Sequence, residues 1–198
     1  MEWNEVVIIV LGSSVVASGV AAGISSWFNL KNSKEQRESE EKKLYFEKAL
    51  EAYEAFSSPF IKSIHHYFNQ AALIDNVLYA TTLTEIKSNE DMEGLASQVM
   101  EILKKNVELD AVHSNASLKI FINTDSCKGE NWETLPTVFD TVLKVLITGL
   151  HGETTMEIVT ANLTTYSNTC KALANMYAEY IRKLQNEFAT QMKVQITL

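Results

Sequence analysis

Charged and apolar positions divide this chain into three parts, and the first contains a stretch of 23 residues, 6–28, without a charged side chain. A helix rises about 1.5 Å per residue, so this stretch reaches roughly 34 Å and can cross a hydrocarbon core of about 30 Å. A secretory signal peptide begins with positive charge and has a shorter apolar core, whereas Glu2 and Glu5 precede this stretch. We therefore predict a transmembrane anchor within residues 1–30.

The predicted span is rich in small residues, which a simple anchor does not need. Gly19 and Gly23 form a small-xxx-small pair, and further glycines and serines share their side of the helix. Close backbone approach and serine hydroxyls favour association of membrane helices, so this side predicts a homo-oligomer. Ordinary dimer packing and a serine-lined pore, with Glu5 near its outer mouth, both fit it. The predicted oligomerisation or pore face comprises Gly12, Ser14, Ser18, Gly19, Gly23 and Ser25.

Lysine and arginine are absent before this stretch and frequent after it. Because positive residues remain on the cytoplasmic side, we expect a single-pass protein of the cytoplasmic (inner) membrane with its N-terminus outside. Residues 31–43, KNSKEQRESEEKK, include nine charged residues of both signs. Such a segment is typical of a solvated helix, so we predict a charged helical stalk between the anchor and the domain that follows.

Residues 44–198 show apolar positions at helical spacing. Ser58 before Pro59 predicts a helix start, because proline is favoured in the first turn, and Asn89 predicts the start of the next helix. Residues 123–133 predict a loop, and residues 135–150 a buried amphipathic helix. A short strand fits only within residues 117–123, which we interpret as a helix end instead.

The last predicted helix has the most regular pattern in the chain, with apolar residues alternating at steps of four and three. This seam consists of Val159, Leu163, Tyr166, Cys170, Leu173, Tyr177, Tyr180 and Leu184. It fits the centre of a bundle or a contact between subunits. The fold predicted for the whole chain is all-α: an N-terminal transmembrane helix that continues through the charged stalk into a cytoplasmic up-and-down helical bundle, residues 44–198.

Candidate chemistry is sparse. Two cysteines without metal-ligand spacing predict reduced thiols, and Cys170 in the seam predicts a core residue. Asp110 and His113 form one relative of the Glu-x-x-His pair, of which a di-metal bundle needs two, so we predict no metal site. Sequence motifs for nucleotide binding and hydrolysis are also missing. We expect neither enzyme activity nor a cofactor.

The net charge of the protein bears on which partners it can bind. A value of −8 disfavours non-specific binding of nucleic acid, which requires a basic surface. A local patch of Lys62, His65 and His66 could still receive an anionic ligand, although such residues are usually only solvated. The expected partners are the lipid bilayer, further copies of the chain, and a cytoplasmic regulatory protein or an anionic ligand.

The layout of an acidic N-terminus, a Gly/Ser-rich span, the segment KNSKEQRESEEKK and a helical domain resembles the small single-pass membrane effectors of bacterial anti-phage defence systems. That resemblance implies an oligomer whose cytoplasmic domain senses a signal and whose membrane helices open a pore, as an ion channel does, or disrupt the membrane. The alternative function is a non-catalytic membrane tether whose bundle holds a cytoplasmic protein partner. The polar, small face of the span favours the effector.

Overall fold

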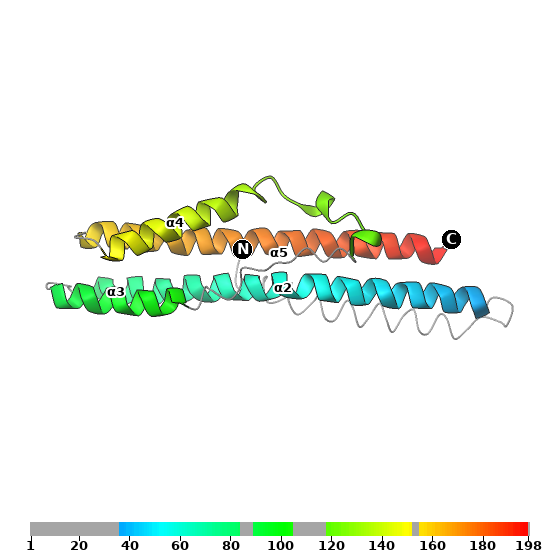
Figure 1. Cartoon of the computed structure of the whole chain (residues 1–198), viewed down its shortest axis with the longest axis horizontal. Coiled ribbons are helices and arrows are strands. Elements are labelled where there is room, and N and C mark those ends of the chain that lie inside the picture. Colours follow the sequence, from blue (N-terminus) through cyan, green and yellow to red (C-terminus); the bar gives the residue numbers. More distant parts are fainter. Residues whose placement is uncertain (1–35, 84–88, 105–117, 152–154, 198) are drawn as a thin grey trace. The chain divides into compact units, whose positions relative to one another are not determined.

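Every regular element in the described part of the computed structural model is helical (Figure 1). The structure describes residues 36–83, 89–104, 118–151 and 155–197. These residues contain the α-helices α2 (Gln36–Leu83), α3 (Asn89–Lys104), α4 (Thr134–His151) and α5 (Met156–Thr197). Two single turns of 3-10 helix, η1 (Leu118–Ile120) and η2 (Asp125–Cys127), lie between α3 and α4 in the sequence. The prediction of an all-α fold is therefore confirmed over these residues.

The chain forms two compact units, and both long helices belong to both of them. Among the described residues, unit 1 comprises 36–61, 118–128 and 178–197, and unit 2 comprises 62–83, 89–104, 129–151 and 155–177. The first part of α2 and the last part of α5 thus lie in unit 1. The remainder of each helix lies in unit 2, together with α3 and α4.

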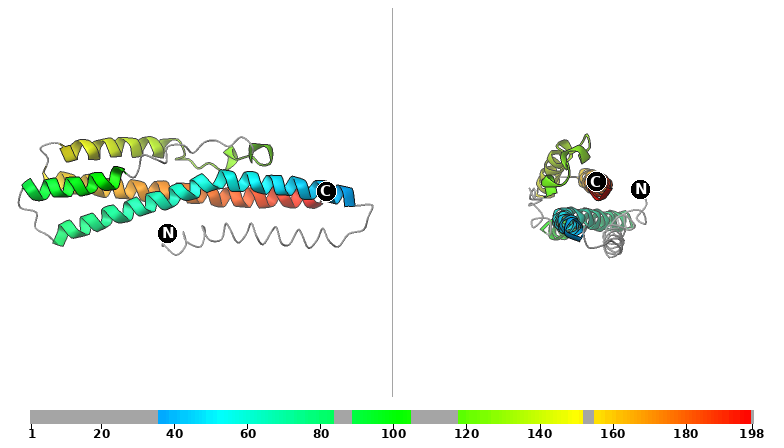
Figure 2. Two further views of the ribbon diagram at one scale, coloured as in Figure 1. Left: turned by 60° about the horizontal axis from the view of Figure 1, so that its bottom comes forward. Right: turned by 90° about the vertical axis from the view of Figure 1, so that its right-hand side faces the viewer.

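Unit 2 is a helical bundle formed by parts of α2 and α5 together with α3 and α4 (Figure 2). These segments share one apolar core. Phe139 of α4 packs against two of its neighbours in this core, with ring centroids 5.2 Å from Tyr67 of α2 and 5.6 Å from Tyr166 of α5. Each segment contributes an apolar face at helical spacing, which is the reason these sequences pack as helices. The buried core residues are Ala71, Ile74, Val77, Leu95, Val99, Ile102, Leu103, Phe139, Leu146, Val159, Leu163, Tyr166, Cys170 and Leu173.

Unit 1 is held together by aromatic side chains of α2 and α5. Phe188 of α5 packs against Tyr53 with ring centroids 4.9 Å apart, and Tyr180 packs against Phe60 at 5.1 Å. Aromatic pairs at such distances stabilise a contact beyond the area that they bury. The segment from η1 to η2 completes this core by burying Leu118, Ile122 and Cys127.

The seam predicted on the last helix is buried inside the chain along almost its full length. Seven of its eight residues are buried, and Tyr177 is half-buried. Leu163, Leu173 and Leu184 are each no more than 1% exposed. The seam therefore packs within the chain, and the alternative of a contact between subunits does not apply to it. The predicted helix start at Asn89, the loop over 123–133 and the helix over 135–150 also agree with the described elements.

The predicted helix start at Ser58 and Pro59 is wrong, because α2 continues through both residues and carries Pro59 inside it. Proline in a helix interior removes one backbone hydrogen bond and costs about 3 kcal/mol. Phe56 and Phe60, on either side of Pro59, are buried, with their ring centroids 5.4 Å apart. We attribute the continuity of α2 to this packing, which offsets the local cost of the proline. Residues 118–120, interpreted as a helix end, form the single turn η1.

Candidate functional site

The candidate anionic patch lies on one turn of α2 in unit 2. Lys62 and His65 are exposed and His66 is half-buried, and the ring of His66 lies edge-on to Tyr67 at a centroid distance of 5.5 Å. Ser63 and Ile64, between them in sequence, are buried. The turn thus presents the lysine and the first histidine to solvent, while the second histidine is partly covered. An anionic ligand at this patch stays a prediction.

A second polar cluster in unit 2 joins α2 to α5, and the sequence pattern did not reveal it. Lys171 Nζ lies 2.7 Å from Asp75 Oδ2, and Ser167 Oγ donates a hydrogen bond of 2.5 Å to Asp75 Oδ1. Ser167 Oγ also lies 3.4 Å from the carbonyl oxygen of Ala71. Ser167 is buried, whereas the side chains of Asp75 and Lys171 are each close to half-exposed. The cluster is an interhelical contact at the rim of the bundle core.

The electrostatics of this cluster favour an ionised carboxylate. Partial burial acts to raise the pKa of Asp75, but the hydrogen bonds from Lys171 and Ser167, with the charge of Lys171, outweigh it and lower that pKa. Ser167 donates its proton to a carboxylate that holds the lysine as well. The cluster therefore fixes helix packing, and a contact between residues 92 positions apart had no local sequence signal.

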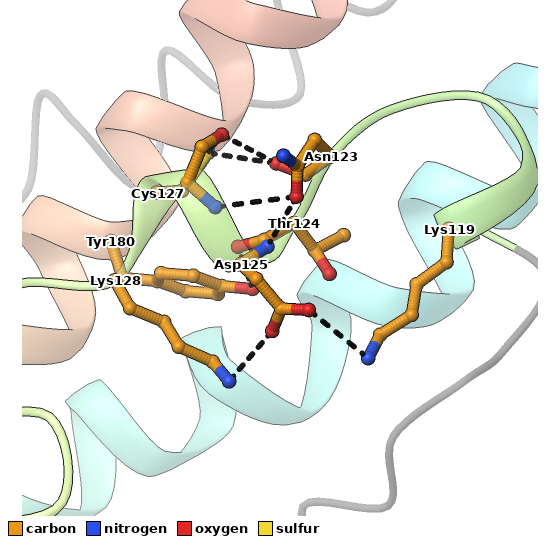
Figure 3. A network of polar contacts seen from close by, with 8 residues as sticks. Lys119, Asn123, Thr124, Asp125, Cys127, Lys128 and Tyr180 are labelled. Carbon is orange, nitrogen blue, oxygen red and sulfur yellow. Dashed lines mark hydrogen bonds and ion pairs between the residues drawn. The ribbon is translucent and has the colours of Figure 1, made fainter.

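A polar network in unit 1 holds the connection between η1 and η2 (Figure 3). Asn123 Oδ1 accepts hydrogen bonds from the backbone N–H groups of Asp125 and Ser126, at 3.2 and 3.4 Å. Tyr180 of α5 donates its hydroxyl proton to the carbonyl oxygen of Thr124 at 3.3 Å. An asparagine that satisfies following N–H groups is a common turn former, so the local sequence explains this shape.

The polar network between η1 and η2 also contains ion pairs, in which one carboxylate contacts two lysines. Asp125 lies 2.7 Å from Lys128 and 3.6 Å from Lys119, and these lysines lower the pKa of its carboxyl group (Figure 3). Burial raises the pKa of the Cys127 thiol, which keeps it protonated. The network is thus suited to holding a loop rather than to nucleophilic chemistry.

The basic residues on α5 are also engaged with acidic partners. Arg182 is bound by Glu179 through two hydrogen bonds of 2.7 and 2.8 Å, and Lys183 lies 3.9 Å from the same carboxylate. Lys171 is likewise paired with Asp75. The positive charges of these three side chains are therefore partly neutralised by carboxylates and are less available to attract a phosphate group. Among the residues that the structure describes, no group of three or more His, Cys, Asp or Glu side chains could hold a metal ion.

Cys170 is a core residue, as its place in the seam predicted. It is fully buried, and this burial raises the pKa of its thiol to about 12. Both cysteines are free. The pair Asp110 and His113 lies outside the described residues.

The predicted oligomerisation or pore face also lies outside the described residues. Gly12, Ser14, Ser18, Gly19, Gly23 and Ser25 all belong to residues 1–35, as do the predicted anchor and the start of the predicted stalk. Within the part of the chain that the structure describes, no helix combines the length and the apolar character needed to cross a membrane.

The chain was compared with models of protein families, with curated proteins and with solved structures, and none of these comparisons found a match.

Proposed function

We propose that this protein is an oligomeric membrane effector whose transmembrane helices form a pore or disrupt the membrane under the control of its cytoplasmic helical domain. The observation that carries the proposal is the uncharged stretch over residues 6–28, with its one-sided face of glycine and serine. Such a face favours close helix association in lipid, where apolar burial provides no driving force. The layout resemblance to effectors of anti-phage defence supports the same function.

The described helical domain is compatible with a sensing role in this proposal. Its seam is buried within the chain, so contacts between copies use other surfaces. The two long helices α2 and α5 each contribute to both units, so each unit shares covalently continuous helices with the other. A signal bound by either unit therefore acts on helices that also form the other.

The test is the mass and the ion conductance of the purified full-length protein. The mass is determined by native mass spectrometry in detergent, and the conductance after reconstitution into a planar bilayer. Ser18→Leu places a bulky side chain on the small face and is expected to abolish conductance while the protein still inserts. Val20→Leu is the matched control, because Val20 projects about 160° away from Ser18, on the apolar side of the predicted helix, and conductance should persist.

The outcomes separate the effector from a membrane tether. A discrete oligomer that conducts, and loses conductance only with Ser18→Leu, supports the proposal. A monomer, or an oligomer that stays silent with and without cellular extract, contradicts it and favours a tether that holds a cytoplasmic protein through the bundle. Equal loss of conductance in both variants would show that the small face has no special role.

A further inference from the structure

The outer face of α4 in unit 2 combines exposed apolar side chains with a pair of opposite charges. Val138 and Val145 are 47% and 51% exposed, although α4 is an apolar helix. Asp140, Thr141 and Lys144 are exposed as well. We call these five residues the α4 face. Isolated surface valines are common in proteins, so the argument depends on how the five residues are arranged.

The α4 face is symmetric about the middle of its helix. The midpoint between Val138 and Val145 falls between residues 141 and 142, and the midpoint between Asp140 and Lys144 falls at residue 142. At about 100° per residue, the two valines lie on one flank of Thr141 and the two charged residues on the other. The centres of the apolar pair and of the charged pair are therefore only half a residue apart, about 0.75 Å along the helix, and the two pairs occupy separate flanks.

This symmetry matches a second copy of the same helix running in the opposite direction. A two-fold axis brings the same flank of two antiparallel helices together and pairs each residue with the one equally far beyond the centre. Val138 then meets Val145 of the other copy, and Asp140 meets Lys144 of the other copy. Each pair occurs twice. In a parallel pairing the valine flank would meet the charged flank, which matches neither apolar nor electrostatic partners.

The threonine hydroxyl groups on this side of α4 already donate hydrogen bonds, so a partner helix can cover them at little cost. Thr141 Oγ1 donates to the carbonyl oxygen of Thr137 at 2.9 Å, and Thr137 Oγ1 donates to that of Glu133 at 3.2 Å. Both threonines thus satisfy their hydroxyl protons within their own helix. Covering them with a partner helix leaves no unpaired hydroxyl donor, which would otherwise be costly.

From this geometry we infer that the α4 face is a homotypic docking surface, on which two copies of unit 2 pair through antiparallel α4 helices. A contact between two single helices is small, and interfaces of this size are usually transient. The pairing is independent of the proposed membrane function, and its test does not use conductance.

Disulfide cross-linking of the full-length protein tests the position of the axis. In Thr141→Cys the two introduced cysteines lie next to the axis, within reach of the roughly 4.4–6.8 Å that Cα atoms of a disulfide span. In Thr137→Cys, one turn earlier and also exposed, the two cysteines are separated by about 14 Å along the helices. We expect a cross-linked dimer with Thr141→Cys and none with Thr137→Cys. The parent chain, whose two cysteines are buried, is the background control.

Charge reversal then tests the pairing itself. In the Thr141→Cys background, Asp140→Lys alone or Lys144→Asp alone brings like charges together across the axis, and cross-linking should be lost. The double reversal restores opposite charges, and cross-linking should return. Circular dichroism of each variant verifies the fold.

Three results would overturn the inference. They are the absence of a dimer with Thr141→Cys, equal dimer formation at positions 137 and 141, and single reversals that leave the cross-linking unchanged. Equal formation at both positions would instead indicate parallel or random collision of the helices. Introducing Ser18→Leu into the Thr141→Cys chain separates this pairing from association through the predicted span, because the cross-link should persist there.

Discussion

At the scale of single residues, the polar groups of this protein hold elements together. Asp75 of α2 is bound by Ser167 and Lys171 of α5, and Tyr180 of α5 donates to the carbonyl oxygen of Thr124. In both places a side chain of α5 donates a hydrogen bond to an oxygen atom of another segment. Such bonds contribute modestly to stability, but they define how the segments align.

The ionised state of Asp75 makes the stability of the bundle depend on pH. Its pKa is lower in the folded protein than in the unfolded chain, where it is about 3.9, so its contribution is complete above that value. It is lost as pH falls through the folded pKa. Asp75→Asn should lower the free energy of unfolding by roughly 0.2–1 kcal/mol at pH 7, because the pair is partly exposed and screened by solvent.

Urea unfolding of the parent and of Asp75→Asn, measured from pH 7 down to pH 3, checks this prediction. The difference between the two proteins should shrink as the pH falls below about 4. Asn168→Ala, an exposed change next to Ser167, is the control, and its effect on the free energy of unfolding should not vary with pH. A difference between the parent and Asp75→Asn that stays constant with pH would show that the charge of Asp75 does not stabilise the fold.

At the scale of elements, α5 is the central packing helix of the described structure. Its seam is buried in both units, with Leu163 in unit 2 and Leu184 in unit 1. The regular alternation of four and three residues predicts one continuous apolar stripe, and the structure confirms it. The same pattern could not reveal whether the stripe packs within one chain or against another chain, because a leucine side chain packs equally well between residues of either.

Leu163→Ala should therefore destabilise the protein strongly. Leu163 is fully buried in the core of unit 2, so the truncation removes apolar contacts and leaves a cavity. Such substitutions cost about 2–5 kcal/mol. Thr164→Ala, at the exposed neighbouring position, is the control and should change stability by about 0.5 kcal/mol or less. Chemical unfolding followed by circular dichroism measures both, and similar values for the two would contradict the packing described.

Replacing Pro59 by alanine should stabilise the protein, whereas Leu163→Ala should destabilise it. Because α2 continues through Pro59, replacing it with alanine restores a backbone donor and removes a clash with the preceding turn. We expect Pro59→Ala to raise the free energy of unfolding by about 1 kcal/mol or more, a fraction of the full cost of a helix-interior proline. Ser58→Ala, at an exposed position of the same helix, controls for alanine propensity. A destabilised Pro59→Ala protein would mean that the proline ring itself is required for packing.

At the scale of the whole molecule, the proposed function depends on the identity of the predicted span. A tether needs only a hydrophobic segment, whereas an effector needs the small face. Replacing residues 6–28 by polyleucine should leave the thermal unfolding of the helical units unchanged and abolish conductance. The same replacement limited to the apolar side, at Ile9, Val20 and Ile24, is the control and should preserve conductance. Full activity with the polyleucine span would favour the tether.

The sequence by itself determined the helical character of the described elements, the positions of α3, α4 and α5, and the stripe on α5. These properties depend on spacing within one segment, and spacing is visible in the chain. It also suggested a membrane span, a stalk and their orientation, which stay predictions.

Only the tertiary structure decided the continuity of α2 through Pro59, the partner of Asp75 and the burial of the α5 seam within the chain. Each of these depends on packing between segments. Local rules favour a helix start at Pro59, but buried aromatic side chains on either side stabilise the uninterrupted helix. The Asp75 cluster joins positions 92 and 96 residues apart, and no local pattern encodes such a pair. The physical reason is that propensity acts within a segment, whereas the choice between competing structures is made by packing between segments.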